Sequence, residues 1–316
     1  NVAVGSQALK NATTADENVA VGMFSSLDNT TGTTNTSVGT YSLQQNTTGN
    51  SNTAIGYQAL QDSTASDNTA VGKAAFRENT SGTEGTAVGL FALKLNTTGN
   101  YNVAVGSQSL EANTTASNCT AMGYQSLTAN TTASSNTAIG WKAASSSTTQ
   151  DNITAVGASA LLNNTGGTDM TAVGRSALAA NTSGDANSAF GRSSMNSNTT
   201  GSNNAAFGKN SLEANTTASN NAAFGYYSLT SNTTGTKNTG LGHQAGYSNT
   251  TANSNTAVGY QALYTNTTGA SNTAVGKSAL NTNTGSHNTA VGTDAMEKNT
   301  TASNSTAVGS NCLKQE

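Results

Sequence analysis

The chain has 316 residues, of which 9% are charged and 5% aromatic, with 33 glycines, no proline and a formal net charge of −3. A globular domain usually has about a quarter of its residues charged, and disordered chains favour proline and high net charge, so neither class fits. Only 12 lysines and arginines are present, spread along the chain, so we expect no nucleic-acid partner and no binding to an anionic membrane.

One short phrase repeats through the whole chain. The glycine of an Ala-Val-Gly-like triplet recurs 19 times, from Gly5 to Gly309, at intervals of 17 residues except for two intervals of 16. Constant spacing predicts one stacked unit and a single repeat domain over residues 1–316. Both short intervals lose their residue in the "NTTG"-like segment, which is therefore predicted to be a loop.

The first predicted strand of each repeat precedes this glycine, which we number position 0. Position −4 is Asn in 14 copies, and its replacements include Cys119, Ile153 and Met170. A column that drifts to apolar residues is expected to be enclosed. We therefore predict that the Asn side chains bond to each other or to the backbone as a buried ladder.

Positions −2 and −1 form a small column and a large apolar column. Position −2 is Ala except for Ser37 and Gly240, and position −1 is apolar in every copy. Neighbouring residues of a strand point to opposite faces. We predict that the large column is a core ladder, represented by Val4, Val21, Val38, Ile55, Val71, Val88, Val105, Phe190, Phe207, Phe224 and Val258.

Positions +1 and +2 vary and are predicted to be a solvent-facing bend. Their aromatic residues are candidate surface contacts, because aromatic rings can stack on sugars; the alternative is that they only cover the flank. These candidates are Tyr57, Tyr124, Trp141, Tyr226, Tyr227 and Tyr260. The following pair, small at +3 and mostly Leu at +4, repeats the small and large arrangement and predicts a second strand.

Together these columns predict an all-β fold, a parallel β-solenoid or β-roll of about 19 coils with 17 residues each and two short strands per coil. One coil can bury one face of each strand by itself. If the large column were exposed to water, each side chain would lose about 1.5–3 kcal/mol of stabilisation from burial. We therefore expect a parallel homo-oligomer in register; the alternative is a monomeric solenoid whose small Ala and Asn face is exposed.

The phrase N-[TV]-A-[VI]-G, present as "NVAVG" at 1–5, "NTAIG" at 52–56 and "NTAVG" at 255–259, resembles the YadA-like, or Hep/Hag, head repeats of trimeric autotransporter adhesins, which also occur in phage tail fibres. The resemblance implies a left-handed parallel β-roll, a homotrimer and a surface fibre that adheres to a host or matrix. The units here are longer than that family's coils by about the "NTTG" loop.

No arrangement of residues predicts catalysis, a metal or a cofactor. His243 and His287 lie at different repeat positions, and the acidic residues form no recurring calcium motif. No candidate nucleophile lies at a sequence spacing from a candidate general base that would predict a catalytic pair. We therefore expect no enzyme.

Two further features concern covalent chemistry. Cys119 and Cys312 lie 11 repeats apart, too far for a disulfide within one straight stack, so we expect buried free thiols or, alternatively, an interchain disulfide between Cys312 residues. The "NTT" and "NTS" sites match the N-glycosylation pattern. Glycosylation is therefore an open alternative at sites that include Asn46, Asn96, Asn130, Asn198 and Asn266.

The leading functional hypothesis is a structural and adhesive one. We expect an extracellular segment of a longer cell-surface or virion fibre, serving as its shaft or head, with its own copies as partners and a host surface glycan or protein as the attachment target. The first residues, "NVAVGSQALK", start in mid-repeat without a signal peptide, and no apolar run is long enough to span a membrane.

Two other functions remain open. An ice-binding solenoid would use the Thr columns at position −3 and in "NTT", but position −3 shares a face with the large column and is expected to be internal. A self-assembling extracellular filament subunit would differ mainly in whether chain ends stack on each other.

Overall fold

The computed structural model describes residues 1–314, which divide into two compact units, residues 1–153 and residues 154–314. Each unit is a parallel β-solenoid built from the same 17-residue coil. The predicted fold class, an all-β parallel solenoid, is therefore confirmed, and the repeat read from the sequence as one domain runs through both units.

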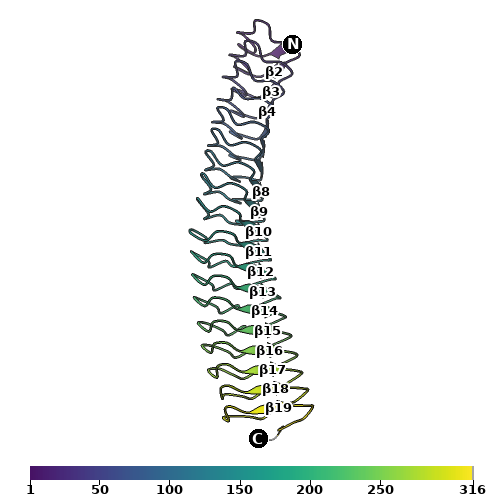
Figure 1. The fold of residues 1–316 in the computed structure, drawn as a ribbon. Coiled ribbons are helices and arrows are strands. Elements are labelled where there is room, and N and C mark those ends of the chain that lie inside the picture. Colours follow the sequence, from purple (N-terminus) through teal and green to yellow (C-terminus); the bar gives the residue numbers. More distant parts are fainter. Residues whose placement is uncertain (315–316) are drawn as a thin grey trace. The chain divides into compact units, whose positions relative to one another are not determined.

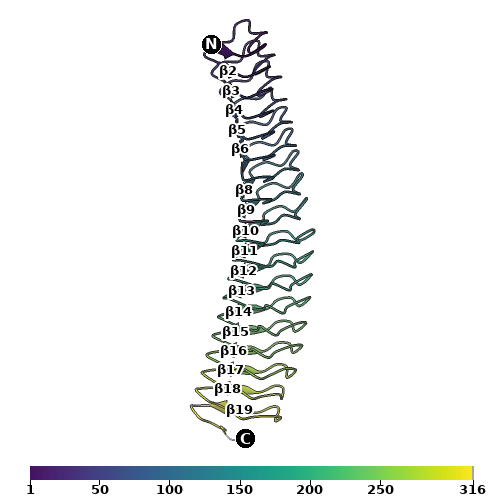
Figure 2. The same ribbon diagram turned by 180° about the vertical axis from the view of Figure 1, so that it is seen from behind.

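Each coil contributes one strand of three residues, at positions −3 to −1. The first unit holds β1 (Val2–Val4), β2 (Val19–Val21), β3 (Thr36–Val38), β4 (Thr53–Ile55), β5 (Thr69–Val71), β6 (Thr86–Val88), β7 (Val103–Val105), β8 (Thr120–Met122) and β9 (Thr137–Ile139). The second unit holds β10 (Thr154–Val156), β11 (Thr171–Val173), β12 (Ser188–Phe190), β13 (Ala205–Phe207), β14 (Ala222–Phe224), β15 (Thr239–Leu241), β16 (Thr256–Val258), β17 (Thr273–Val275), β18 (Thr289–Val291) and β19 (Thr306–Val308). Within each unit the strands stack in chain order (Figure 1), as the view from behind also shows (Figure 2).

Equivalent repeat positions pair in neighbouring strands. In β7 and β8, Ala104 pairs with Ala121. The register survives both 16-residue intervals: Thr53 of β4 pairs with Thr69 of β5, and β17 pairs with β18 in the same way. The missing residue therefore lies outside the strand, which confirms the loop prediction for the "NTTG" segment.

The second apolar pair, at positions +3 and +4, forms no strand within residues 1–314, so the prediction of two strands per coil is wrong. Positions +2 and +4 adopt positive φ, as in Gln108 (59°) and Leu110 (48°), and such left-handed residues bend a chain that extended residues would keep straight. The backbone still bonds to neighbouring coils: Gln108 N donates to Leu90 O at 2.8 Å, and Leu110 N donates to Ser126 O at 3.0 Å. This wall satisfies its amides between coils without extended strand geometry.

Burial explains why leucine occupies a left-handed position. The left-handed conformation costs a residue with a Cβ about 1–2 kcal/mol. Leu43, Leu93, Leu110 and Leu212 are fully buried, and burial of such a side chain contributes about 1.5–3 kcal/mol. The apolar gain therefore offsets the backbone cost, coil after coil.

The interior of the coil is narrow where it meets the strand. Side chains at position −2 point inward, and Ala104, Ala121 and their equivalents are fully buried. Where glycine occupies this position, at Gly240, an added Cβ would collide with Ser228 Oγ and lie 3.0 Å from Leu229 Cγ. Only small residues fit on the inward face of the strand.

The column predicted as the core ladder therefore lies on the outer face, and that prediction is wrong for the single chain. Val4 is 57% exposed, Ile55 41% and Phe224 38%. The other members are exposed or half-buried in the same way: Val21, Val38, Val71, Val88, Val105, Phe190, Phe207 and Val258. The prediction that positions −2 and −1 point to opposite faces is correct, but the narrow interior holds the small side chains at position −2.

Two asparagine ladders fill the rest of the interior. At position −4, Asn18 Oδ1 accepts from Asn35 N at 2.8 Å, and Asn18 Nδ2 donates to Gly32 O at 2.8 Å. At position +7, Asn113 Nδ2 donates to Asn96 Oδ1 of the preceding coil at 2.6 Å. These contacts confirm the predicted buried Asn ladder and add a second one.

The glycine at position 0 meets two constraints. Gly106 has φ +134°, and an added Cβ would lie 2.5 Å from Gly123 O of the next coil. Position +10 also holds glycine in many coils, but without positive φ, as at Gly99. Alanine fills that position in other coils, including Ala116 and Ala133. Positive φ is therefore not required at this position of the "NTTG" loop.

We predict that Gly106→Ala lowers the free energy of unfolding by at least about 2 kcal/mol, because it adds backbone strain to a steric clash. The matched control is Gly166→Ala at position +9, where φ is not positive and an added Cβ would lie 3.3 Å or more from its nearest neighbours. Urea denaturation followed by circular dichroism measures both. Equal losses for the two variants would contradict the special role of position 0.

We further predict that Asn164→Ala destabilises the second unit by on the order of 2–4 kcal/mol, because it leaves the amide and carbonyl of Gly167 without their side-chain partners at 3.0 and 2.8 Å. The neighbouring Asn163 is exposed, so Asn163→Ala should change stability by less than about 0.5 kcal/mol. Thermal denaturation of both variants tests this, and a mild effect of Asn164→Ala would show that the ladder contributes little.

Candidate interaction surfaces

The outer sheet face, defined here as the side chains at positions −3 and −1, is repeated in every strand of each unit. Thr or Val occupies most of its places, and no residue at either position is charged. In the second unit Phe190, Phe207 and Phe224 form a stack, with ring centroids 4.6 and 4.8 Å apart. The face is uncharged and lies outside the coil, with an apolar column at position −1 and a mainly threonine column at position −3.

The aromatic surface candidates lie in the bend after the strand, as predicted. Five of the six occupy position +1 and are exposed: Tyr57, Tyr124, Trp141, Tyr226 and Tyr260. Tyr227 occupies position +2, is half-buried, and meets Tyr226 edge-on at 4.1 Å between centroids. In the first unit, Tyr57 packs edge-on against Tyr41 at 6.1 Å, and Lys142 Nζ lies 4.9 Å from the Trp141 ring.

The structure gathers two of these candidates into one ladder in the second unit. Tyr226, His243 and Tyr260 occupy position +1 of three successive coils, with centroids 5.4 and 5.3 Å apart. Lys209 Nζ lies 5.2 Å from the Tyr226 ring on the preceding coil. Tyr57, Tyr124 and Trp141 belong to the first unit and do not join this ladder.

Cations extend the same column, which we call the basic-aromatic column. It comprises seven exposed residues at position +1 of successive coils, namely Arg175, Arg192, Lys209, Tyr226, His243, Tyr260 and Lys277. The sequence reasoning treated lysine and arginine as spread along the chain and missed this alignment. The alignment is present in the sequence at position +1 of these seven successive repeats.

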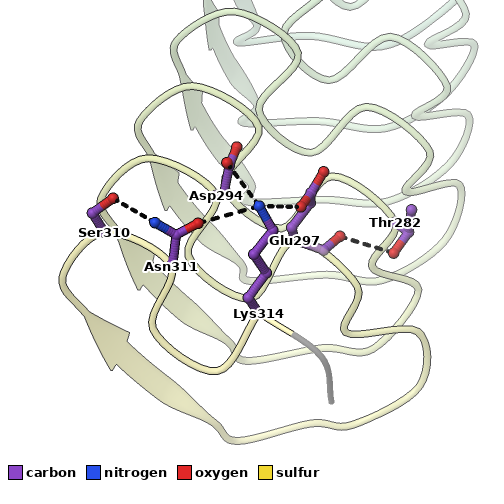
Figure 3. Close-up of polar contacts among 6 residues, drawn as sticks. All are labelled: Thr282, Asp294, Glu297, Ser310, Asn311 and Lys314. Atoms are coloured by element: carbon purple, nitrogen blue, oxygen red, sulfur yellow. Dashed lines mark hydrogen bonds and ion pairs between the residues drawn. The ribbon is translucent and has the colours of Figure 1, made fainter.

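The ion pairs of the described residues lie elsewhere. Arg77 pairs with Glu78, and Lys314 pairs with Asp294 at 3.0 Å and with Glu297 at 3.2 Å (Figure 3). Hydrogen bonds to Asp294 and then Glu297 raise the pKa of Lys314 above its ordinary value. This cluster links neighbouring coils and carries no chemistry of its own.

The described residues offer no catalytic or metal-binding constellation. Residues 1–314 contain no group of three or more His, Cys, Asp or Glu placed to hold a metal ion, and no pocket is found in this part of the chain. None of the described residues forms a helix that could cross a membrane. His243 lies among the tyrosines of the ladder, and His287 adopts a left-handed turn conformation.

Both cysteines are free thiols. Cys119 is fully buried in the position −4 column, where its Sγ lies 3.3 Å from Ala133 O. Burial raises the pKa of the Cys119 thiol. Cys312 is half-buried against the interior of the last coils.

The glycosylation sites face inward. Their asparagines occupy the position +7 ladder and are at most 1% exposed: Asn46, Asn96, Asn130, Asn198 and Asn266. A glycan on any of them would replace a buried amide proton and require space that the interior does not have. Folding and glycosylation at these five sites are therefore mutually exclusive.

No family model and no curated protein matches this chain. The functional interpretation therefore depends on the geometry of the outer sheet face and the basic-aromatic column.

We predict that iodoacetamide modifies Cys312 in the folded chain but leaves Cys119 unmodified until the chain unfolds, because alkylation needs an accessible thiolate and burial both shields Cys119 and raises its pKa. Peptide mass spectrometry after timed alkylation measures the two rates. Modification of Cys119 in the native chain at the rate of Cys312 would place the position −4 column outside the core.

Proposed function

We propose that this chain is the shaft or head of an extracellular or virion surface fibre, that identical chains assemble side by side as a parallel homotrimer, and that the fibre attaches to a host or another surface. The observation that carries this proposal is the outer sheet face. It places the apolar side chain at position −1 of every coil on the outside of the chain.

Self-association is supported by the chemistry of that face. Contiguous apolar surface of this kind marks interaction sites in soluble proteins. No charged residue at positions −3 or −1 has to be desolvated, which removes the largest penalty of burial. In a parallel, in-register assembly every coil makes the same contact, so a small gain per coil accumulates along the stack.

The fibre role is supported by the backbone and by the resemblance of the repeat. Coil-to-coil hydrogen bonds extend through strand, bend and loop, which leaves few open backbone segments for proteases. The phrase N-[TV]-A-[VI]-G resembles YadA-like head repeats, whose homotrimeric, extracellular and adhesive character we extend to this chain as part of the proposal.

Ice binding is a second candidate, and one observation favours it. The Thr column at position −3 lies on the outer face instead of the interior, half-buried in most coils, as at Thr120 and Thr137. The expectation that this column is internal was one argument against ice binding, and its outer position removes that argument. The other argument still holds, because the "NTT" threonines lie in a loop whose length varies between coils. End-to-end filament assembly remains a further alternative.

We predict that the wild-type chain sediments with three times its 31.5 kDa mass and that Val88→Glu with Val105→Glu releases single chains, because both substitutions place charge on the outer sheet face. The matched control is Leu90→Glu with Ser107→Glu, which adds the same charge at position +1 of the same two coils and should preserve the assembly. Sedimentation velocity measures mass, and circular dichroism confirms that the fold persists.

The same samples separate the alternatives. A wild-type chain that stays single at every concentration contradicts the assembly proposal. If that single chain also shows thermal hysteresis, and the Val88→Glu, Val105→Glu variant loses it, the outer sheet face binds ice. Electron microscopy of the wild type shows whether particles also join end to end.

A further inference from the structure

The basic-aromatic column is held in register by the backbone. Each residue at position +1 accepts a hydrogen bond from position +2 of the next coil: Ser193 N donates to Arg175 O at 2.9 Å, and Asn210 N donates to Arg192 O at 3.0 Å. The same bond recurs through the column as far as Lys277. With a spacing of about 4.8 Å per coil, seven coils place these side chains along roughly 29 Å.

The positive charge of this column is not neutralised by the chain. None of Arg175, Arg192, Lys209 and Lys277 is in an ion pair in the described structure. The nearest acidic residues of these coils occupy other repeat positions, with Glu213 at position +5 accepting from Asn210 Nδ2. Three successive cations, three rings and a fourth cation therefore face solvent in one line.

The rings present their edges to a ligand. His243 and Tyr260 stack with an interplanar angle of 13°, so their faces cover each other while the side-chain edges remain outside. Tyr226 is 39% exposed and Tyr260 47%. Such rings offer rigid apolar surface and two phenol hydroxyls at a small entropic cost.

We propose that the basic-aromatic column binds an acidic polysaccharide, an extended chain of sugars that carries sulfate or carboxylate groups. The arginine guanidinium groups can bind such anions in a bidentate manner, and the tyrosine hydroxyls can bond to sugar hydroxyls. The rise per coil is close to the length of one sugar ring in an extended chain. Successive coils can therefore make the same contact with successive sugars. The inference deepens the attachment role proposed above and rests on it.

A polysaccharide fits the column better than a nucleic acid does. Rings that are stacked on one another leave no gap for a base to enter, whereas single strands are bound mainly by base stacking on open aromatic faces. A linear sugar chain with charges near both ends of the ring ladder matches the arrangement of cations.

The test uses the full chain and a heparin octasaccharide as the probe, with a polygalacturonate octasaccharide and a neutral dextran oligosaccharide of equal length beside it. We expect the two acidic probes to bind and the neutral one to bind much more weakly. Replacing Arg175, Arg192 and Lys209 together by Gln should weaken heparin binding about tenfold, since each exposed ion contact contributes modestly. Raising the salt concentration should weaken binding of the wild type in the same way.

The matched control replaces Lys73, Lys94 and Lys142 by Gln, which removes the same charge from the first unit. We expect this variant to retain wild-type binding, and Tyr226→Ala with Tyr260→Ala to lose affinity without changing the salt dependence. If the variant of Arg175, Arg192 and Lys209 and the variant of Lys73, Lys94 and Lys142 lost equal heparin affinity, binding would depend on overall charge alone. That result would overturn the proposal. So would failure of both acidic probes to bind, or tighter binding of a single-stranded DNA of equal length.

Assembly is measured on the same samples by sedimentation. The basic-aromatic column lies outside the outer sheet face, so the substitutions in it should leave the mass of the assembly unchanged. An intact assembly that binds no acidic polysaccharide overturns this inference alone. A wild-type chain that does not assemble refutes the proposed fibre, whatever it binds.

Discussion

Backbone hydrogen bonds between successive coils are the interaction on which each solenoid unit depends. They occur in the three-residue strands, in the bend and in the loop, so each coil has little choice of position relative to the next. Close approach at position 0 excludes any side chain there, and glycine is the only residue that fits. The 17-residue period of the sequence is the direct result of this repeated contact.

The same close winding determines which side chains reach the surface. A narrow interior accepts alanine at position −2, leucine at position +4 and two asparagine ladders whose amides bond to one another and to the backbone. In the described structure the Oδ1 atoms of Asn130, Asn249 and Asn266 have no hydrogen-bond partner. The apolar residues at position −1 point to the opposite face of the strand from position −2 and therefore lie on the outer sheet face. Positions −1 and +1 thus both lie outside the coil, and the outer sheet face and the basic-aromatic column provide the two surfaces on which the proposed assembly and attachment depend.

Sequence periodicity predicted the repeat, the parallel stack, the loop and the position −4 ladder, because each depends on residue types that recur at fixed places. It could not show which strand face is inside, since alternation defines two faces but not the width of the coil. The second strand was predicted wrongly because positive φ at Leu110 and its equivalents leaves no mark in residue type. The basic-aromatic column was missed because the net charge of the chain does not show that lysines and arginines occupy the same position of successive repeats, which stacking places side by side.

Residue-resolved amide hydrogen exchange tests the coil-to-coil bonding most directly. The account predicts that the amides of Gln108 and Leu110, which lie in the bend but donate to neighbouring coils, exchange as slowly as that of Val105 in β7. The amide of Ser107, which donates no hydrogen bond in the described structure, should exchange much faster. Rapid exchange at Gln108 and Leu110, at the rate of Ser107, would contradict the claim that each coil is bonded to its neighbours beyond its strand.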